Sequence, residues 1–261
     1  MRHLTLDPRQ AREAILAGRA PAGLHVDGTL DLAQLSQPVA LPEGLVVRRL
    51  LLRGSRELVE LPAGLHCYEL DASDTMLREL PAGSAIEYRL NLTGCIALER
   101  LPDGLTVGSL ILQGCSTLTA LPEGLSVSFL DISGCSQLQH WPQSGSIYAG
   151  HLWARGCSGL RSLPAWIGTI AQLNLAGCRG LRDLPATIQV SSWIDLAGTG
   201  ITWLPAGARR AQLRWNGVPI DARIAFQPET ITGQEILQEP NAERRRVLLE
   251  RMGYPAFLAQ V

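Results

Sequence analysis

Five cysteines recur at intervals of 20 to 22 residues, and cysteine can bind metals, form disulfides or act as a nucleophile. They are Cys95, Cys115, Cys135, Cys157 and Cys178. Zinc sites need pairs of cysteines a few residues apart, which this spacing does not provide. The pattern instead predicts a ladder of small buried side chains whose S–H groups face loop carbonyls. Ser55, Asp74 and Thr199 take the same place in other repeats, and Cys67, which lies off the ladder, is predicted to be core.

Other arrangements that could support catalysis are scarce. His151 and Asp131 form the only histidine–carboxylate neighbourhood predicted on an outward face, and no serine or cysteine of nucleophilic context accompanies them. All 23 basic residues are arginine, which excludes a catalytic lysine, a Schiff base and a P-loop. The sequence therefore predicts a protein that is not an enzyme and that holds no catalytic residue, no metal and no cofactor.

A leucine-proline pair recurs in steps of 19 to 22 residues along most of the chain. The pairs begin at Leu41, Leu61, Leu80, Leu101, Leu121, Leu163, Leu184 and Leu204, with Trp141-Pro142 in the one missing place. A period of this length is typical of a solenoid, in which each unit buries its apolar side against its neighbours. One repeat reads Leu-Pro-x-Gly-Leu-x-Val-x-x-Leu-x-Leu-x-Gly-Cys-x-x-Leu-x-x.

The Leu-x-Leu step has a period of two, so it predicts a strand with both leucines facing inward. The expected strands lie near residues 29–33, 49–53, 69–73, 89–93, 109–113, 129–133, 151–155, 172–176, 193–197 and 212–216. Stacked repeats place them in one parallel sheet. The proline in each return segment opposes a helix, so that segment is expected to be extended or a single 3₁₀ turn.

This repeat resembles the leucine-rich repeat, whose signature Leu-x-x-Leu-x-Leu-x-x-Asn/Cys-x-Leu it reproduces. Its short period and Leu-Pro-x-Gly-Leu segment are similar to a bacterial subclass that also occurs in secreted virulence effectors. The resemblance implies an α/β repeat fold: a leucine-rich-repeat solenoid with a curved parallel β-sheet on the concave face, extended or 3₁₀ convex segments, and helical caps at both ends. It divides the chain into an N-terminal helical cap at 1–23, a solenoid of about nine to ten repeats at 24–218, and a C-terminal helical cap or tail at 219–261.

Both ends carry helix signals. Asp7-Pro8 is expected to begin a short helix that Gly18 ends, covering the first repeat. Thr232-x-x-Glu235 is a capping-box pattern, and Asn241 is placed to cap a further helix that ends at Gly253. These segments, together with Trp215-Asn216-Gly217-Val218-Pro219, resemble the tail of an uncharacterised bacterial domain family to which no activity is attached. The run 244–246 is all arginine, and pairing with nearby glutamates is its expected use.

The outward strand positions are left free by the repeat pattern, and they hold the candidate binding residues. All six tryptophans lie between 141 and 215, and two of them are predicted to point outward beside a phenylalanine. Exposed aromatic and arginine side chains supply most of the binding energy at many interfaces. The other four tryptophans are predicted to be core. The predicted partner-binding residues are Phe129, Asp131, His151, Trp153, Arg155, Asn174, Trp193, Asp195 and Arg214.

Taken together, these patterns predict a non-catalytic scaffold that binds a protein or peptide partner through the concave face of its repeats. Hydrophobic residues make up 46% of the chain and charged residues 18%, and the net charge of -1 favours neither nucleic acid nor a membrane as partner. No small-molecule substrate is evident. The chain start lacks an apolar signal core, so a cytoplasmic location is expected.

Two alternatives remain open. One is a secreted effector of the type III kind that enters a host cell without a cleavable signal and binds a host protein, for which the absence of lysine is the only hint, although an arginine-favouring genome also explains it. The similar effectors often add a ubiquitin-ligase domain built on a Cys-x-Asp motif, but no cysteine follows Cys178. The other is an accessory or catalytic peptide-processing role of the C-terminal helical unit.

Overall fold

The computed structural model describes residues 4–261, apart from the side chain of Ala149. Twelve strands form one sheet in chain order and wind as a β-solenoid. All neighbours are parallel except the last two, which are antiparallel. The strands are β1 (Thr5–Leu6), β2 (His25–Asp31), β3 (Val46–Leu51), β4 (His66–Asp71), β5 (Ala85–Asn91), β6 (Ser109–Ile111), β7 (Leu125–Asp131), β8 (Gly145–Trp153), β9 (Thr169–Asn174), β10 (Gln189–Asp195), β11 (Gln212–Trp215) and β12 (Val218–Ile220).

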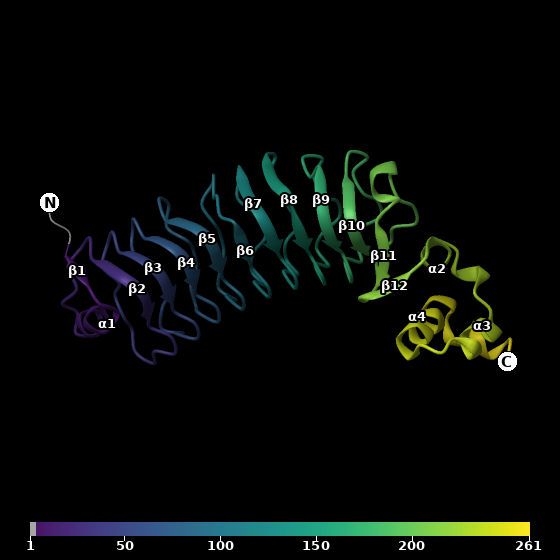
Figure 1. Cartoon of the computed structure of the whole chain (residues 1–261), viewed down its shortest axis with the longest axis horizontal. Coiled ribbons are helices and arrows are strands. Elements are labelled where there is room, and N and C mark those ends of the chain that lie inside the picture. The colour runs from purple at the N-terminus through teal and green to yellow at the C-terminus, as the bar shows by residue number, and fades with distance from the viewer. Residues whose placement is uncertain (1–3) are drawn as a thin grey trace.

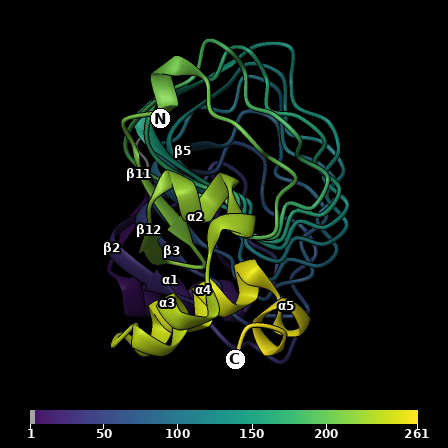
Figure 2. The same cartoon turned by 90° about the vertical axis from the view of Figure 1, so that its right-hand side faces the viewer.

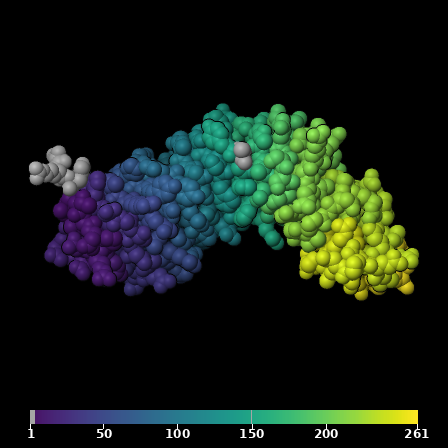
Figure 3. All heavy atoms as spheres, viewed as in Figure 1, coloured from purple at the N-terminus to yellow at the C-terminus, as the bar shows by residue number. Residues whose placement is uncertain are grey.

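The molecule is an elongated arc whose C-terminal helices gather at one end (Figures 1 and 3). Seen along the stack, the strands lie on one side of each turn and the return segments on the other (Figure 2). The short helices are α1 (Pro8–Leu16), α2 (Ala222–Phe226), α3 (Gly233–Gln238), α4 (Ala242–Met252) and α5 (Tyr254–Leu258), with 3₁₀ turns η1 (Ala206–Ala208) and η2 (Pro228–Thr230). Within residues 4–261, no helix has the length and apolar character that crossing a membrane requires.

The predicted parallel solenoid is confirmed, but the predicted strand bounds are wrong by several residues in most turns. Most strands begin three to six residues earlier than expected and end two residues earlier. The reason is a second inward position ahead of the Leu-x-Leu step: Val26 pairs with Val47, and Val47 with Cys67, so these residues also join the ladder. A register shift between Val26 and Thr29 separates the two paired segments of β2. Of the return segments, η1 alone contains a 3₁₀ turn among the described residues.

The core is a set of aliphatic ladders that run the length of the stack. The first leucine of each Leu-x-Leu step is at most 1% exposed in the turns from Leu30 to Leu173. The leucine of the leucine-proline pair closes the core from the return side; Leu61, Leu121 and Leu184 are each buried. Because each turn buries its apolar atoms against the turns above and below, the sheet's outward face is held in a fixed register.

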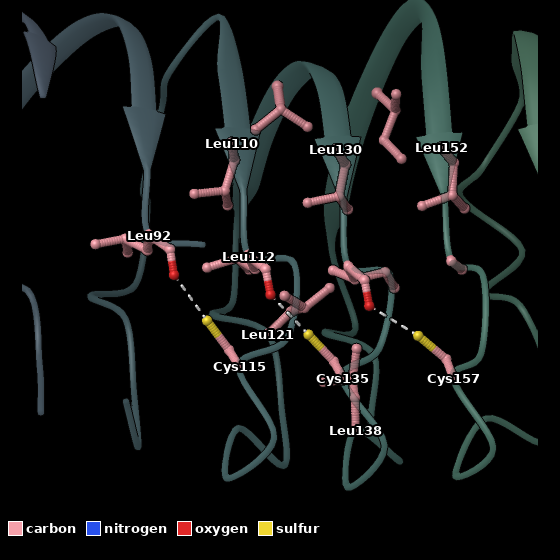
Figure 4. Close-up of a cluster of buried hydrophobic side chains, with 14 of the residues drawn as sticks. Leu92, Leu110, Leu112, Cys115, Leu121, Leu130, Cys135, Leu138, Leu152 and Cys157 are labelled. Atoms are coloured by element: carbon pink, nitrogen blue, oxygen red, sulfur yellow. Dashed lines mark hydrogen bonds between the residues drawn. The ribbon is translucent and has the colours of Figure 1, made fainter. Parts of the chain in front are cut away.

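The cysteines form the predicted ladder (Figure 4). Each thiol donates to a main-chain carbonyl one turn back: Cys115 to Leu92 O at 3.1 Å, and Cys135 to Leu112 O at 3.1 Å. Ser55 makes the equivalent bond to Leu32 O at 2.8 Å. The remaining cysteine bonds of the ladder run from Cys95 to Ala72 O, Cys157 to Ile132 O, and Cys178 to Ala154 O.

The expectation that Asp74 occupies the cysteine position was wrong. Thr75 occupies it, and its hydroxyl donates to Ala72 O at 2.8 Å. Asp74 stands where most turns carry glycine, and its φ of 57° lies in the left-handed region that glycine favours and aspartate tolerates. The Gly-Cys pair of the repeat is therefore replaced in this turn by Asp-Thr.

The raised pKa values of the buried thiols predict how the free energy of unfolding depends on pH. Burial raises the pKa of Cys67 and of Cys135 from 9.0 to about 12, with the charge of Glu87 adding to the effect at Cys67. The folded chain therefore keeps these thiols protonated at pH values where the unfolded chain loses the protons. We expect the free energy of unfolding to be unaffected by these groups below pH 9 and to fall between pH 9 and pH 12, by roughly 1.4 kcal/mol per pH unit for each thiol.

Urea unfolding at a series of pH values measures this slope. Cys135→Ser is the matched variant, because Ser55 shows that a serine hydroxyl can make the same bond to the carbonyl one turn back. Above pH 9, the free energy of unfolding of Cys135→Ser should fall less steeply with pH than that of the parent. The difference should correspond to about one proton per molecule. Equal slopes in the two proteins would contradict the assignment.

The predicted N-terminal helix is confirmed as α1. The carboxylate of Asp7 accepts from the backbone N–H groups of Arg9 and Gln10, and Pro8 occupies the first helical position. Ala11 and Ile15 are buried, and the helix lies against β2. Residues 1–3 of the predicted cap lie outside the described residues, and the capping role itself stays a prediction.

The helices α3 and α4 lie where the sequence predicts them, whereas the short helix α2 was not predicted. Asn216-Gly217 forms the two-residue turn of a hairpin between β11 and β12, with φ of 50° and 84°. The Thr232 hydroxyl accepts from Glu235 N, but the Glu235 carboxylate pairs with Arg223 instead of completing the capping box. Asn241 caps α4 through Arg244 N.

The arginine run 244–246 at the start of α4 forms its contacts within the tail, as predicted. Arg246 pairs with Glu243 and Glu250, and Arg244 pairs with Asp221 and Glu239. The remaining member, at position 245, donates to the main-chain carbonyl of Glu239. The guanidinium groups are thus occupied by contacts inside the tail.

One tryptophan joins the tail to the solenoid. The indole N–H of Trp215, in β11, donates to Glu250 of α4 at 2.8 Å, and the Arg251 guanidinium lies 4.1 Å from the centre of its ring. Arg251 also donates to the carbonyls of Ile224 and Ala225 at 3.0 and 2.7 Å. These contacts hold α2, α4 and the last parallel strand together.

Candidate binding surface

The outward positions of the sheet form continuous rows, as the sequence predicts. The first row pairs Phe129 with His151 and Trp193 with Gln212 across neighbouring strands. A second row, two residues later in each strand, pairs Asp131 with Trp153, Trp153 with Asn174, Asn174 with Asp195, and Asp195 with Arg214. We call these two rows the sheet face. They place eight of the nine predicted site residues on strands β7 to β11.

Three of these residues form one aromatic cluster, which we define as Phe129, His151 and Trp153. The rings of Phe129 and Trp153 meet edge to face with their centres 5.1 Å apart, and those of Phe129 and His151 with centres 6.1 Å apart. All three side chains are half-buried. The His151 Nδ1 and the Trp153 N–H have no hydrogen-bond partner among the described residues, so ring packing holds the cluster together.

Trp193 and Arg214 form a second pair further along the sheet face. The guanidinium carbon of Arg214 lies 4.4 Å from the centre of the Trp193 ring, a cation–π contact. Arg214 also donates to the Gln212 side chain at 3.3 Å. The ring is therefore partly covered by a charged group that is itself half exposed.

The acidic and amide residues of the second row serve the fold. Asp131, Asn174 and Asp195 each accept, through one side-chain oxygen, the backbone N–H two residues later, at 2.9 to 3.1 Å. Asp195 is only 2% exposed and also accepts from Asn216 N at 3.1 Å and Gly217 N at 2.6 Å. These bonds end each strand with a tight turn, which is a structural use that the sequence analysis did not identify.

Arg155 is the ninth predicted residue, and it lies just after β8 rather than on a strand. Its side chain is exposed and forms no ion pair with any residue of the described chain. It stands beside the second row, two residues after Trp153.

The expected neighbours His151 and Asp131 form no hydrogen bond or ion pair with each other in the described chain. His151 packs against the Phe129 ring, whereas the Asp131 carboxylate bonds to Ser133 N. The structure instead pairs His66 with Glu87, whose Nε2 and Oε1 atoms lie 2.9 Å apart on the exposed side of β4 and β5. The sequence analysis missed this pair because it placed both residues ahead of the strands. The neighbouring Cys67 is buried, and its raised pKa keeps the thiol protonated.

The remaining tryptophans were predicted to be core, which holds for Trp215 alone, since Trp141 and Trp166 are partly buried against the core and Trp203 is exposed. Trp203 is 51% exposed in the segment before η1, because its neighbours Leu204 and Ile201 fill the inward positions. Trp215 is buried as expected. Trp141 and Trp166 pack edge to face at 6.0 Å and donate to the carbonyls of Ser162 and Pro142.

A hollow lies on the sheet face next to the aromatic cluster. Its volume is about 400 Å³, and we call it the central groove. Its lining comes from β5 to β8 and the residues that follow β5 and β6: Arg89, Asn91, Thr93, Ser109, Ile111, Gln113, Phe129, Asp131 and Trp153. Three of these residues belong to the predicted site, and the others were not among the candidates.

No group of three or more metal-ligating side chains gathers anywhere in residues 4–261. Comparisons with models of protein families, with curated proteins and with solved structures found no match to this chain.

Proposed function

We propose that the chain is a non-catalytic scaffold that binds a protein or peptide partner through its sheet face, as a leucine-rich repeat does. The observation that carries the proposal is the aromatic cluster, because three half-buried rings stand next to an open groove on an otherwise regular surface. A rigid ring contributes a large contact area and loses little conformational freedom when a partner covers it.

The turn-forming bonds narrow the set of residues that would contact a partner. Asp131, Asn174 and Asp195 use their side-chain oxygens within the fold, which leaves less capacity for recognition. The remaining predicted residues keep partly exposed rings or charged groups: Phe129, His151, Trp153, Arg155, Trp193 and Arg214. We therefore place the main contribution to affinity on the aromatic cluster, with Trp193 and Arg214 at its edge.

Trp153→Ala is expected to weaken partner binding by at least about tenfold and Trp193→Ala by a smaller factor, because truncating a central aromatic anchor costs about 2 kcal/mol or more. Peptides selected from a displayed random library on the full chain supply the ligands, and fluorescence anisotropy measures their dissociation constants. Trp203→Ala is the matched control, since Trp203 is exposed but lies on a return segment away from the sheet face.

Circular dichroism should show the same folded content in all three variants, because none of the replaced rings lies in the hydrophobic core. The proposal fails if selected peptides bind Trp153→Ala as tightly as the parent chain. It also fails if the selection yields no saturable ligand.

A further inference from the structure

The central groove exists because a small side chain stands between large ones. In the first row, Ser109 lies between Arg89 on one side and Phe129 on the other. Below it, Ile111 forms a half-buried apolar floor between Asn91 and Asp131. The groove is therefore open to solvent above, apolar at its base, and bounded by an arginine at one end and by aromatic rings at the other.

The arginine at that end, Arg89, is a cation that no ion pair neutralises among the described residues. Arg49, one strand beyond, is neutralised by Glu69 at 3.0 Å. The Asp71 carboxylate accepts from Ser73 and from Asn91. Arg89 is exposed and forms neither an ion pair nor a side-chain hydrogen bond within residues 4–261.

The opposite end of the groove has the opposite charge. Asp131 lies there, 6% exposed and held by Ser133 N, close to the rings of Phe129 and Trp153. A carboxylate on a ligand is therefore attracted at the Arg89 end and repelled at the ring end. An apolar side chain fits the ring end and the Ile111 floor, where it buries surface against carbon atoms.

We infer that the central groove binds an extended peptide segment in which an acidic residue contacts Arg89 and an apolar or aromatic residue contacts Phe129 and Trp153. This inference rests on the proposed function and adds the chemistry of the partner. Gln113, exposed at the groove's edge, offers an amide donor and acceptor to the peptide backbone.

The geometry of the sheet sets the spacing of the two peptide residues. Neighbouring strands lie about 4.8 Å apart, so Arg89 on β5 is about 10 Å from the β7 position of Phe129. Trp153 lies three strands away and two residues further along its strand, at about 16 Å. An extended peptide advances about 3.3 Å per residue and presents every second side chain to the same face. The acidic and apolar residues should therefore stand four positions apart, a span of about 13 Å that lies between the two distances.

Deep sequencing of the random peptide library after selection on the full chain tests the inference. On the parent chain, Asp or Glu placed four positions from Leu, Phe or Trp should be enriched at least about fivefold over other spacings. On Arg89→Glu, the acidic preference should be lost and replaced by Lys or Arg at the same spacing. Arg48→Glu, an equal change of charge at an exposed position outside the groove lining, should keep the acidic preference.

The outcomes separate this inference from the proposed function. The inference is overturned, and the scaffold proposal stands, if the selected peptides require Trp153 but show no preference for an acidic residue. The same holds if the peptides selected on Arg89→Glu still prefer an acidic residue. If binding is independent of Trp153, both fail. If the chain alone forms dimers that Trp153→Ala dissociates, the groove binds a second copy and the peptide assignment is wrong; light scattering at the concentration of the selection measures this.

Discussion

Asp195→Ala is expected to lower the free energy of unfolding by about 4 kcal/mol, because it leaves three backbone N–H groups without their acceptor. The carboxylate accepts from Ala197, Asn216 and Gly217 and is 2% exposed. Two of these donors form the turn of the β11–β12 hairpin, from which the C-terminal helices continue. The loss should therefore loosen the tail as well as destabilise the last turns.

Asp31→Ala is the control, because Asp31 occupies the same row on β2 and accepts only Ala33 N among backbone donors. Its side chain is exposed, so water can replace the lost acceptor, and a change of at most about 1 kcal/mol is expected. Urea unfolding measures both variants, and limited proteolysis reports release of residues 219–261. Equal destabilisation by the two substitutions would contradict the role given to Asp195.

Gly150→Ala is expected to destabilise the chain by about 3 kcal/mol through steric overlap. A Cβ atom at position 150 would collide with the main-chain carbonyl of Ser128 on the adjacent strand. A backbone atom held in the sheet cannot rotate away as a flexible side chain can, so β7 and β8 would have to separate. Since these strands carry Phe129, His151 and Trp153, the substitution should also weaken partner binding.

Gly168→Ala is the matched control for this change. Gly168 has no positive φ, and a Cβ atom there meets nothing within 4 Å. The melting temperature of Gly168→Ala should stay within about 2 °C of the parent's or rise slightly, because alanine reduces the conformational freedom of the unfolded chain. A similar melting temperature for Gly150→Ala would show that the two strands can move apart at little cost.

The solenoid and the rows of its sheet could be predicted because the Leu-x-Leu step of each repeat determines them. The leucines of the Leu-x-Leu step must face inward, and a period of two then assigns each neighbour, such as Phe129 or Trp153, to the outward face. The ends of the strands could not be predicted from that step. They depend on a second inward position, held by Val26 or Val47, and on the register shift that lies between the two segments.

The details of the site depend on contacts between residues far apart in the chain. That Asp195 serves the hairpin at Asn216 cannot be read from either segment alone, because 21 residues separate them. Trp203 was misassigned because a tryptophan beside a leucine-proline pair has no pattern of its own that marks it as exposed. The central groove could not be predicted because it depends on the small side chain of Ser109 lying between Arg89 on β5 and Phe129 on β7.

The cysteine ladder makes an internal turn interchangeable with the turns beside it. Cys115 bonds to Leu92 O and Cys135 to Leu112 O by the same geometry, so each layer presents one donor to the layer before it and one acceptor to the layer after it. Excising one whole period would rejoin matching surfaces and shorten the rod by a single increment of about 4.8 Å. The length of the molecule therefore changes in steps of one turn. Inserting or deleting the codons of one whole period would lengthen or shorten the stack without changes elsewhere in the sequence.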